Sequence, residues 1–589
     1  MTECAIVKVR TIWHNMIRRH KVPKENKMEE KTMKKILASL LALAMILALV
    51  PAVMAEGAEE PITVTFFYGS AADQPLDDNK IYKKIEEEFG IKFEFETLGG
   101  DLNEKLNLLM SDEENLPDFI NGSNAAESLY AGEVLIDLLP YISEEKTPNL
   151  YKHIYTDDRI KQLLTEDGKL YIIPNFGINY NAQIQNYNNG PSFFIQKQVI
   201  AWNDYKVPTT INEYFDLIEA FIAANPTNKD GTPYKGFAIL TDDWRRFCMI
   251  NPVQHLMGRP NDGEVLVDVN DPDFHTETFI DKPYAKPYYK KLNEEYHKGI
   301  ISADTFTMKF EQYIADLATG TVLGMFDQTW DFNDATNSLM DSKMYENTYL
   351  AIPLIYTAED LEGIEMPTPD WKIEEHYLNG AVMNKDRGAG ISINCKYPER
   401  LVNLMEALMS DEWQKLLQWG VEGEDYYVEN GRMLMTKEQF EQRSNNAWIR
   451  SNRANILYES FPKKSGTMDD GNAWDPNNQP EIYFGQMNDY DKAFLEACGK
   501  KTPAEFFNPP ITLAPYGEAW QIDKTPIDID YNKGFIATQD QMLPGVITAE
   551  EGEFDAKWDE FVTTIKPYCD IYANFMHEEI LKLVKLVTE

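Results

Sequence analysis

The order of the elements along the chain predicts an α/β fold with more than one lobe. Residues 62–68 form a β-branched and aromatic run, and residues 91–96 alternate between apolar and charged side chains, so both segments are typical of strands. Between them, residues 79–90 place apolar side chains at helical spacing and end in glycine. Such alternation is typical of a parallel sheet with covering helices. The 589 residues exceed what one hydrophobic core needs and indicate two to four domains, at about 150 residues each.

The following residues continue this alternation. Residues 102–110 have helical spacing, and the apolar run 116–120 meets Asn-Gly-Ser, which predicts a third strand and a loop. Residues 463–480 are rich in Asp, Asn, Gly and Pro, which predicts a long surface loop. Further helices are predicted at 211–224, 288–299, 399–410 and 411–420.

Composition and charge exclude several functional classes. The chain carries 56 Lys and Arg against 96 Asp and Glu, a formal charge of −40. This excess repels phosphate backbones and anionic membrane surfaces, so we expect no nucleic-acid partner and no membrane-surface partner. Hydrophobic residues make up 43% and charged residues 26%, as in a folded protein. The aromatic share of 12% is high for so charged a chain.

The first 55 residues are expected to lie outside the fold. Met33-Lys34-Lys35 precedes an apolar run at 36–50, and small residues precede Glu56, which together predict a secretory signal peptide at 33–55. An uncleaved membrane anchor is the alternative, because the apolar segment could just span a bilayer. The basic, polar residues 1–32 are interpreted as a disordered product of a mis-assigned start.

Removal of the first 55 residues changes the charge and the cysteine count. These residues carry 10 Lys and Arg and 4 Asp and Glu, a net +6, so the remaining chain carries −46 instead of −40. No lipobox cysteine follows the expected cleavage site. We therefore expect an extracellular protein, either secreted or associated with the outer face of the cell membrane. The cysteines that remain are Cys248, Cys395, Cys498 and Cys569.

Metal, cofactor and catalytic signatures are missing from the sequence. Four cysteines are too few for a disulfide scaffold, so we expect buried free thiols, although an oxidising exterior permits one or two bridges. The eight histidines are not clustered, and no Walker, GxGxxG, HExxH, GxSxG or EF-hand pattern is present. We expect no metal, no cofactor and no catalytic residue. Paired carboxylates carry no information, because 96 acids produce many chance pairs.

Aromatic side chains at predicted strand ends are the remaining signal. Tyr68, Phe176, Trp244 and Trp330 lie near Gly, Asn, Arg or Asp at such positions. Ligands of open α/β sheets bind at the carboxyl ends of strands. Sugar rings offer CH-rich faces that lie flat on aromatic rings and hydroxyls that need amide or carboxylate partners, so this combination favours carbohydrate binding. The competing interpretation is that most of these aromatics are core residues.

Four segments form an ordered series along the chain. They are a Pro-Thr helix start, a helix end with a Gly cap, a strand that runs into a Trp loop, and a Trp-Gly segment. In order, these are VPTTINEY at 207–214, LNEEYHKGII at 292–301, GTVLGMFDQTWD at 320–331 and DEWQKLLQWGVEGEDY at 411–426. Together they resemble the family 1 extracellular solute-binding proteins of bacterial ABC importers, in the large lipoprotein-like branch common in Gram-positive bacteria.

The resemblance implies a two-lobed fold of the periplasmic-binding-protein type (type II), with the ligand in a cleft between the lobes. Chain crossings near 173–175, 351–353 and 420–423 are expected to form the hinge. The implied division is 56–175 and 353–420 for the first lobe, and 176–352 and 421–589 for the second.

By analogy with ligand sites of the family, seven residues are candidates for ligand binding. They are Tyr68, Asn124, Phe176, Trp244, Trp330, Asp331 and Tyr426. Trp330 and Tyr426 lie in matched segments, and the others follow from strand-end position. Some relatives carry a calcium-binding loop just after the helix that begins with the VPTT segment at 207–210. Residues 225–231 here lack most of its carboxylates, so we expect no calcium.

The resemblance implies a monomeric, non-enzymatic binding protein. It would capture a solute, with an oligosaccharide as the expected class, and deliver it to ABC transporter permease subunits by hinge closure. A secreted carbohydrate-active enzyme with two carboxylates is one alternative. A peptide or sugar-phosphate ligand within the same family is another. The phosphate would require Arg245 and Arg246 to point inward.

Overall fold

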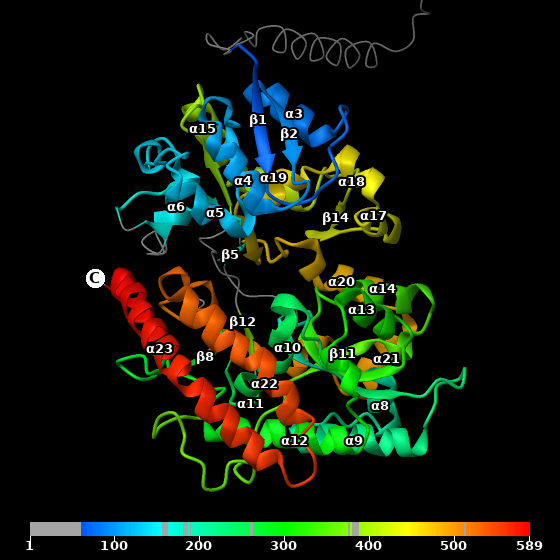
Figure 1. Cartoon of the computed structure of the whole chain (residues 1–589). Coiled ribbons are helices and arrows are strands. Elements are labelled where there is room, and N and C mark those ends of the chain that lie inside the picture. Colours follow the sequence, from blue (N-terminus) through cyan, green and yellow to red (C-terminus); the bar gives the residue numbers. More distant parts are fainter. Residues whose placement is uncertain are drawn as a thin grey trace, which may run out of the picture. The chain divides into compact units, whose positions relative to one another are not determined.

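The computed structural model of the chain (Figure 1) describes residues 60–155, 163–165, 167–175, 177–180, 186–188, 190–259, 263–374, 377–379, 388–511, 514–517 and 519–588. Ile62–Glu589 form one compact unit. The predicted signal peptide and the residues before it lie outside the described residues. None of the helices in the described ranges combines the length and apolar character that a membrane span requires.

The first sheet has five strands in the order β2-β1-β3-β13-β4. Strand β1 (Ile62–Tyr68) pairs in parallel with β2 (Ile91–Thr97) and with β3 (Phe119–Asn121). Strand β13 (Gly388–Ile391) is antiparallel to β3 and to β4 (Ile173–Pro174). The predicted strands at 62–68 and 91–96 are therefore confirmed, and the strand predicted at 116–120 begins only at Phe119. Two antiparallel strands from distant sequence extend the sheet.

Helix α3 (Lys80–Phe89) shows why the first predicted helix is correct. The Asn79 side chain accepts hydrogen bonds from the backbone N–H groups of Ile81 and Tyr82, at 3.0 and 3.1 Å, which begins the helix. Gly90 ends it at a φ of 61°, a conformation that glycine adopts without strain. The helix buries Ile81 and Ile85 against the sheet.

Helices α15 (Pro398–Leu408), α16 (Asp411–Gln418) and α19 (Asn455–Ser460) contribute to the core of the first sheet. The first two confirm the helices predicted at 399–410 and 411–420 to within two residues. Helix α19 packs in this core, although the predicted division assigns 421–589 to the second lobe. The division into lobes itself remains a prediction.

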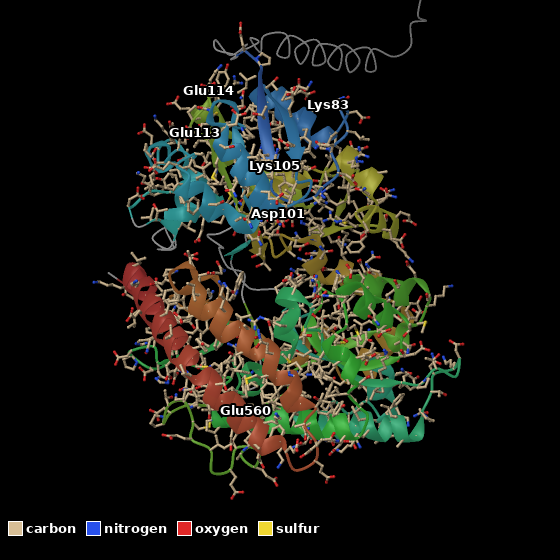
Figure 2. The ribbon with its side chains drawn as sticks, viewed as in Figure 1. Lys83, Asp101, Lys105, Glu113, Glu114 and Glu560 are labelled. Atoms are coloured by element: carbon tan, nitrogen blue, oxygen red, sulfur yellow. The ribbon has the colours of Figure 1, made fainter. Side chains whose placement is uncertain are left out.

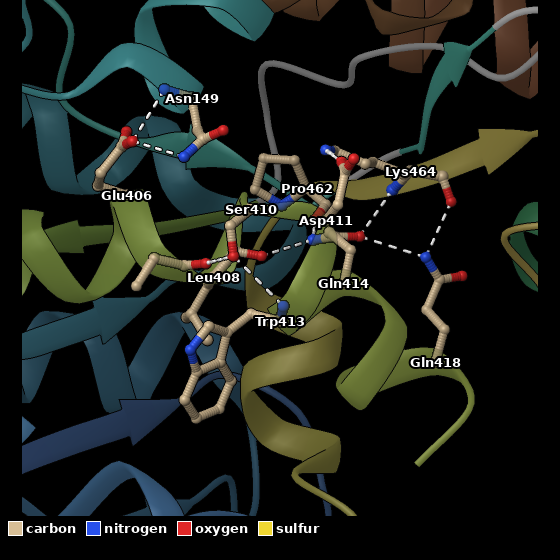
Figure 3. Close-up of polar contacts among 11 residues, drawn as sticks. Asn149, Glu406, Leu408, Ser410, Asp411, Trp413, Gln414, Gln418, Pro462 and Lys464 are labelled. Carbon is tan, nitrogen blue, oxygen red and sulfur yellow. Dashed lines mark hydrogen bonds and ion pairs between the residues drawn. The ribbon is translucent and has the colours of Figure 1, made fainter. Parts of the chain in front are cut away.

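Polar contacts fasten α16 to a neighbouring strand (Figure 3). The buried Gln414 amide donates to the carbonyls of Leu408 and Pro462 and accepts from the backbone N–H of Lys464. One turn later, the Gln418 amide donates to the Lys464 carbonyl at 2.9 Å. Each of these buried amides is therefore bonded to backbone groups, as burial requires.

The predicted surface loop at 463–480 is only partly correct. Its first residues form strand β16 (Lys463–Gly466), parallel to β5 (Gly177–Tyr180). Asn472 is buried, and its side-chain amide is hydrogen-bonded: it donates to the Gly431 carbonyl and accepts from the Met433 N–H. The polar composition satisfies backbone groups of a neighbouring hairpin here, so it does not indicate solvent exposure.

The second sheet has the order β11-β6-β10-β7. Strand β10 (Val322–Gln328) is parallel to β7 (Lys235–Ala238) and antiparallel to β6 (Pro191–Gln196), which pairs antiparallel with β11 (Tyr349–Ile352). Helix α9 (Ile211–Ala224) has the predicted bounds and packs in the core of this sheet.

The C-terminal part adds two long helices to the second core. Helix α23 (Phe554–Thr588) runs beside α22 (Ala537–Ile547), as Figure 1 shows in red and orange. A π-helix, η12 (Ile529–Ile536), leads directly into α22. Helix α12 (Lys286–His297) packs in the same core and confirms the helix predicted at 288–299.

Shorter elements complete the described chain. The further helices are α4 (Leu102–Ser111), α5 (Ala126–Ala131), α6 (Pro148–Tyr155), α8 (Lys197–Trp202), α10 (Phe247–Ile250), α11 (Pro252–Leu256), α13 (Phe310–Ala318), α14 (Asn333–Asp341), α17 (Lys437–Gln442), α18 (Asn446–Asn452), α20 (Pro480–Gln486) and α21 (Asp489–Ala497). The further strands are β8 (Val265–Val267), β9 (Thr276–Thr278), β12 (Tyr377–Asn379), β14 (Tyr427–Glu429), β15 (Arg432–Leu434) and β17 (Asn508–Ile511).

Many charged side chains lie on the surface, and the described cysteines are free. Asp101, Glu113, Glu114 and Glu560, which Figure 2 labels, are all exposed. The negative charge is therefore at least partly solvated surface charge.

Of the four described cysteines, Cys248 and Cys569 are buried and the other two are half-buried, and none forms a disulfide.

Candidate functional site

Two tryptophans form an exposed aromatic surface beside the second sheet. The rings of Trp244 and Trp330 stack with centroids 5.7 Å apart and an interplanar angle of 14°. Both side chains are 46% exposed, which is unusual for so large an apolar group. Trp244 also stacks on Phe247, at 5.8 Å and 10°. The three rings therefore form an aromatic stack whose two tryptophans are open to solvent.

Trp330 is held by the turn that follows β10. Its indole N–H donates to the Gln328 side chain at 2.8 Å, and the backbone N–H of Asp331 donates to the Gln328 carbonyl at 2.9 Å. The Thr329 hydroxyl donates to the Asn188 carbonyl at 2.8 Å. These bonds fix the turn, so the exposed ring has a defined orientation before any ligand arrives.

Trp244 is held by Arg245, which follows it in the short helix η4 (Asp243–Arg246). The Arg245 Nε–H donates to both carboxylate oxygens of Asp331, at 2.9 and 3.0 Å. Its guanidinium lies 4.5 Å from the Trp244 ring centroid and 3.6 Å from that of Phe310. Arg246 hydrogen-bonds to Glu264 in the core. Both arginines are thus paired with carboxylates of the chain itself.

Two buried acids lie beneath the aromatic pair. Asp327 is completely buried, and it accepts hydrogen bonds from the Tyr313 hydroxyl and from the Gln328 N–H, each at 2.7 Å. Burial, and then the charge of Asp331, raise the pKa of Asp327 to about 7. Burial also raises the pKa of Asp331, against the opposing effect of Arg245. The negative charge of these buried carboxylates is therefore compensated by the Arg245 guanidinium.

Replacing Asp327 with Asn is expected to flatten the pH dependence of stability. With a folded-state pKa of about 7 and an unfolded value of about 3.9, the folded protein keeps a proton that the unfolded chain releases. The wild-type free energy of unfolding should therefore fall as pH rises between these values, by at most about 1.4 kcal/mol per pH unit from this group. Urea unfolding of both proteins from about pH 4.5 to about 7.5 measures the difference, and equal slopes would contradict it.

A second candidate place lies at the carboxyl end of β1. Tyr68 ends the strand and lines a pocket of about 270 Å³. The loop after it passes close to β3, because a Cβ on Gly69 would lie 2.6 Å from the Asn121 carbonyl oxygen. Helices α18 and α19 contribute most of the opposite wall. The polar residues of the lining are Tyr68, Asp73, Tyr82, Asn446, Arg450, Arg453, Asn455 and Glu459.

The structure brings some of the predicted ligand residues together and separates others. Trp244, Trp330 and Asp331 form one cluster, but the Asp331 side chain is only 2% exposed and is held by Arg245. Asn124 is exposed at the surface. Tyr426 is buried in an apolar cluster, 5.4 Å from the Trp419 ring. Phe176 lies outside the described residues.

The pocket residues beyond Tyr68 were not predicted from the sequence. Arg450 and Arg453 lie in a helical, polar stretch that resembles solvent-exposed surface when read alone. Only the tertiary contacts between residues 73–82 and 446–459 give them a shared site. No local pattern in the sequence reports that contact.

Metal ligands are not clustered in the described ranges. There, no three His, Cys, Asp or Glu side chains are grouped as a metal ion would require. In the loop 225–231, the Asn228 side chain accepts hydrogen bonds from the backbone N–H groups of Asp230 and Thr232, both at 2.9 Å. An amide therefore closes this turn.

Comparison with known proteins identifies the family. The sequence pattern of the family described as "Bacterial extracellular solute-binding protein" matches residues 80–419, more than half of the chain. Among curated proteins, none matches significantly.

Solved structures match nearly the whole chain. An extracellular solute-binding protein from Bifidobacterium longum subsp. infantis matches with a TM-score of 0.60 and 15% identity, over 91% of this chain and 100% of its own. An HMO-binding, ABC-transporter-associated protein of the same organism matches with a TM-score of 0.56 and 15% identity, over 90% of this chain and 99% of its own. An S. pneumoniae ABC-transporter substrate-binding protein in complex with kestose matches with a TM-score of 0.56 and 17% identity, over 88% of this chain and 99% of its own.

These matches confirm the predicted α/β fold class and the resemblance to extracellular solute-binding proteins. The matched structures are binding proteins. The chain belongs to the bacterial extracellular solute-binding protein family.

Proposed function

We propose that this protein captures an oligosaccharide outside the cell and delivers it to the permease of an ABC transporter. The observation that carries the proposal is the exposed pair of stacked rings, Trp244 and Trp330, held in place by a buried charge network. The B. longum protein described as HMO-binding and the S. pneumoniae protein bound to kestose support the same ligand class.

The aromatic pair suits a sugar for physical reasons. A pyranose or furanose ring has a CH-rich face that removes apolar surface from water when it lies flat on an indole ring. The network around Arg245 fixes the rings in advance, so little conformational entropy is lost when the ligand binds. Closure of two lobes around the ligand would then supply polar contacts to its hydroxyls and present a new surface to the permease. Micromolar affinity requires only about −8 kcal/mol.

Catalysis is not part of the proposal. A glycosidase needs two carboxyl groups roughly 5 Å or 6.5–9.5 Å apart on either side of the scissile bond. Asp331 follows Trp330 directly and Asp327 begins the same turn, and both carboxylates are buried and hydrogen-bonded within the protein. A sugar-phosphate ligand also lacks support at this place, because Arg245 and Arg246 are paired with carboxylates.

The remaining parts of the proposal concern the whole chain. Residues 33–55 would direct export, and the protein would act as a monomer, secreted or held at the outer face of the membrane. The two lobes would comprise the discontinuous segments predicted from the sequence, and the ligand cleft would lie between them.

Isothermal titration with a panel of oligosaccharides, neutral and acidic, tests the function. At least one is expected to bind with a Kd in the micromolar range or below, and chromatography after prolonged incubation should recover it unchanged. A peptide panel serves as the comparison for the other ligand class. Release of a smaller sugar would show that the protein is an enzyme and would overturn the proposed function. Binding of peptides alone would overturn oligosaccharides as the ligand class.

A further inference from the structure

Two arginines line the pocket at the end of β1. Arg453 lines the pocket and is only 8% exposed, and Arg450 lines it with partial exposure. Neither forms an ion pair with any residue that the structure describes. Arg453 donates to the Leu417 carbonyl at 2.8 Å and Arg450 to the Gln74 carbonyl at 2.7 Å, so both bond to neutral acceptors.

A third arginine strengthens this positive region. Arg443 donates to the Gln418 carbonyl at 3.0 Å. Burial and the charge of Arg453 lower the pKa of Arg443 to about 10, and burial lowers that of Arg453 as well. Lowered pKa values mean that the surroundings disfavour the positive charge. An anion placed in the pocket would relieve this cost.

The acids near these arginines are already engaged. Glu459, in the pocket wall, forms an ion pair with Lys463 at 2.9 Å. Asp73 accepts a hydrogen bond from the Asn446 amide. Farther along, Asp425 pairs with Lys80 at 2.5 Å, and Asp475 accepts the Asn477 N–H at 2.8 Å.

We infer that this pocket is a subsite for one acidic sugar unit, a hexuronate whose carboxylate binds Arg450 and Arg453. A guanidinium forms a planar fork that matches a carboxylate in two parallel hydrogen bonds. The Tyr68 ring and the amides of Asn446 and Asn455 complete a lining suited to a sugar ring and its hydroxyls. A volume of about 270 Å³ is smaller than that of pockets for drug-sized ligands, so it suits a single ring.

A single negative charge also agrees with the charge of the whole chain. At −40, the protein repels polyanions, whereas one carboxylate can be attracted by a local cluster of arginines. The inference rests on the proposed function and narrows its ligand class to oligosaccharides that carry a uronic acid.

The test uses pairs of oligosaccharides that differ only at the acid. The probes are hexuronate-containing trisaccharides and the same trisaccharides with the carboxylate reduced to a primary alcohol. Titration of the wild-type protein is expected to show at least one pair in which the acidic sugar binds about tenfold more tightly or better. This preference should shrink when NaCl is raised from about 20 to about 200 mM, because salt screens the charge.

Variants locate the preference. Arg450→Gln and Arg453→Lys should each reduce the ratio between acidic and reduced sugar by about fivefold or more, the second because lysine lacks the planar fork. Arg432→Gln is the matched control, because it removes one positive charge at an exposed ion pair with Glu481. It should leave the ratio unchanged. Retained binding of the reduced sugar shows that each variant is folded.

The outcomes separate this inference from the proposed function. Equal affinity for the acidic and reduced members of every pair would overturn the acidic subsite while the sugar-binding function stands. A preference that survives both pocket variants would place the carboxylate elsewhere and would also overturn it. Absence of binding by neutral and acidic sugars alike would overturn the proposed function itself.

Discussion

Replacing both Trp244 and Trp330 with alanine is expected to weaken oligosaccharide binding by about 100-fold or more. Truncating an aromatic residue at the centre of a binding surface commonly costs about 2 kcal/mol, and about 1.4 kcal/mol corresponds to a tenfold change in Kd. The rings touch, so the two losses are not additive and the double variant should fall short of their sum. Titration with the tightest oligosaccharide of the panel measures the loss.

Trp202→Ala provides the matched control for this experiment. Trp202 is 44% exposed, nearly the same as the paired tryptophans, but it packs edge-on against Phe221. Its removal should leave sugar affinity within about twofold. Because the paired rings are half exposed, their removal should change the melting temperature little. An unchanged Kd in the double variant would remove the aromatic pair from the ligand site.

The beginning of the first sheet could be predicted because its signals are local. Strand β1 has a continuous apolar and β-branched run, and α3 carries its own start and stop residues, Asn79 and Gly90. Strand β13 could not be assigned to this sheet in the same way. It follows β3 by more than 250 residues along the chain, and antiparallel pairing over that distance depends on the packed core rather than on a local pattern.

The candidate site, like the first sheet, could be predicted from the sequence only in part. The sequence named Trp244 and Trp330 as separate candidates, and only the structure shows that the two exposed rings stack. The sequence also named Asp331 for its polar group, although that carboxylate is held by Arg245. A sequence states which residue types are present, whereas the partner of a charged group is set by the tertiary fold. The role of Arg245 therefore became visible only in the structure.

Replacing Arg245 with methionine is expected to destabilise the protein by about 3–5 kcal/mol. Methionine keeps much of the apolar contact with Trp244 and Phe310, so the loss reports mainly on charge. Without the guanidinium, the carboxylate of Asp331, which is 2% exposed, lies uncompensated beside Asp327. The free energy of unfolding in urea measures the cost.

An exposed ion pair of the same region gives the control. Lys309 and Asp242 are 2.7 Å apart, but the lysine side chain is 72% exposed, so Lys309→Met should cost no more than about 1 kcal/mol. Adding Asp331→Asn to Arg245→Met should recover part of the loss, because a buried amide costs less than an unpaired carboxylate. If the Arg245 variant were no less stable than the Lys309 variant, the charge network would not be what holds the aromatic surface.

The pH dependence of this loss distinguishes charge from packing. In the Arg245→Met variant the pKa of Asp331 should rise further, because burial already raises it and its opposing cation is gone. Protonation of Asp331 in the folded variant, which removes the unpaired charge, is therefore easier at about pH 5 than at about pH 8. The gap in unfolding free energy between wild type and variant should therefore be smaller at the lower pH. A gap that is independent of pH would assign the loss to packing against Trp244 and Phe310 instead.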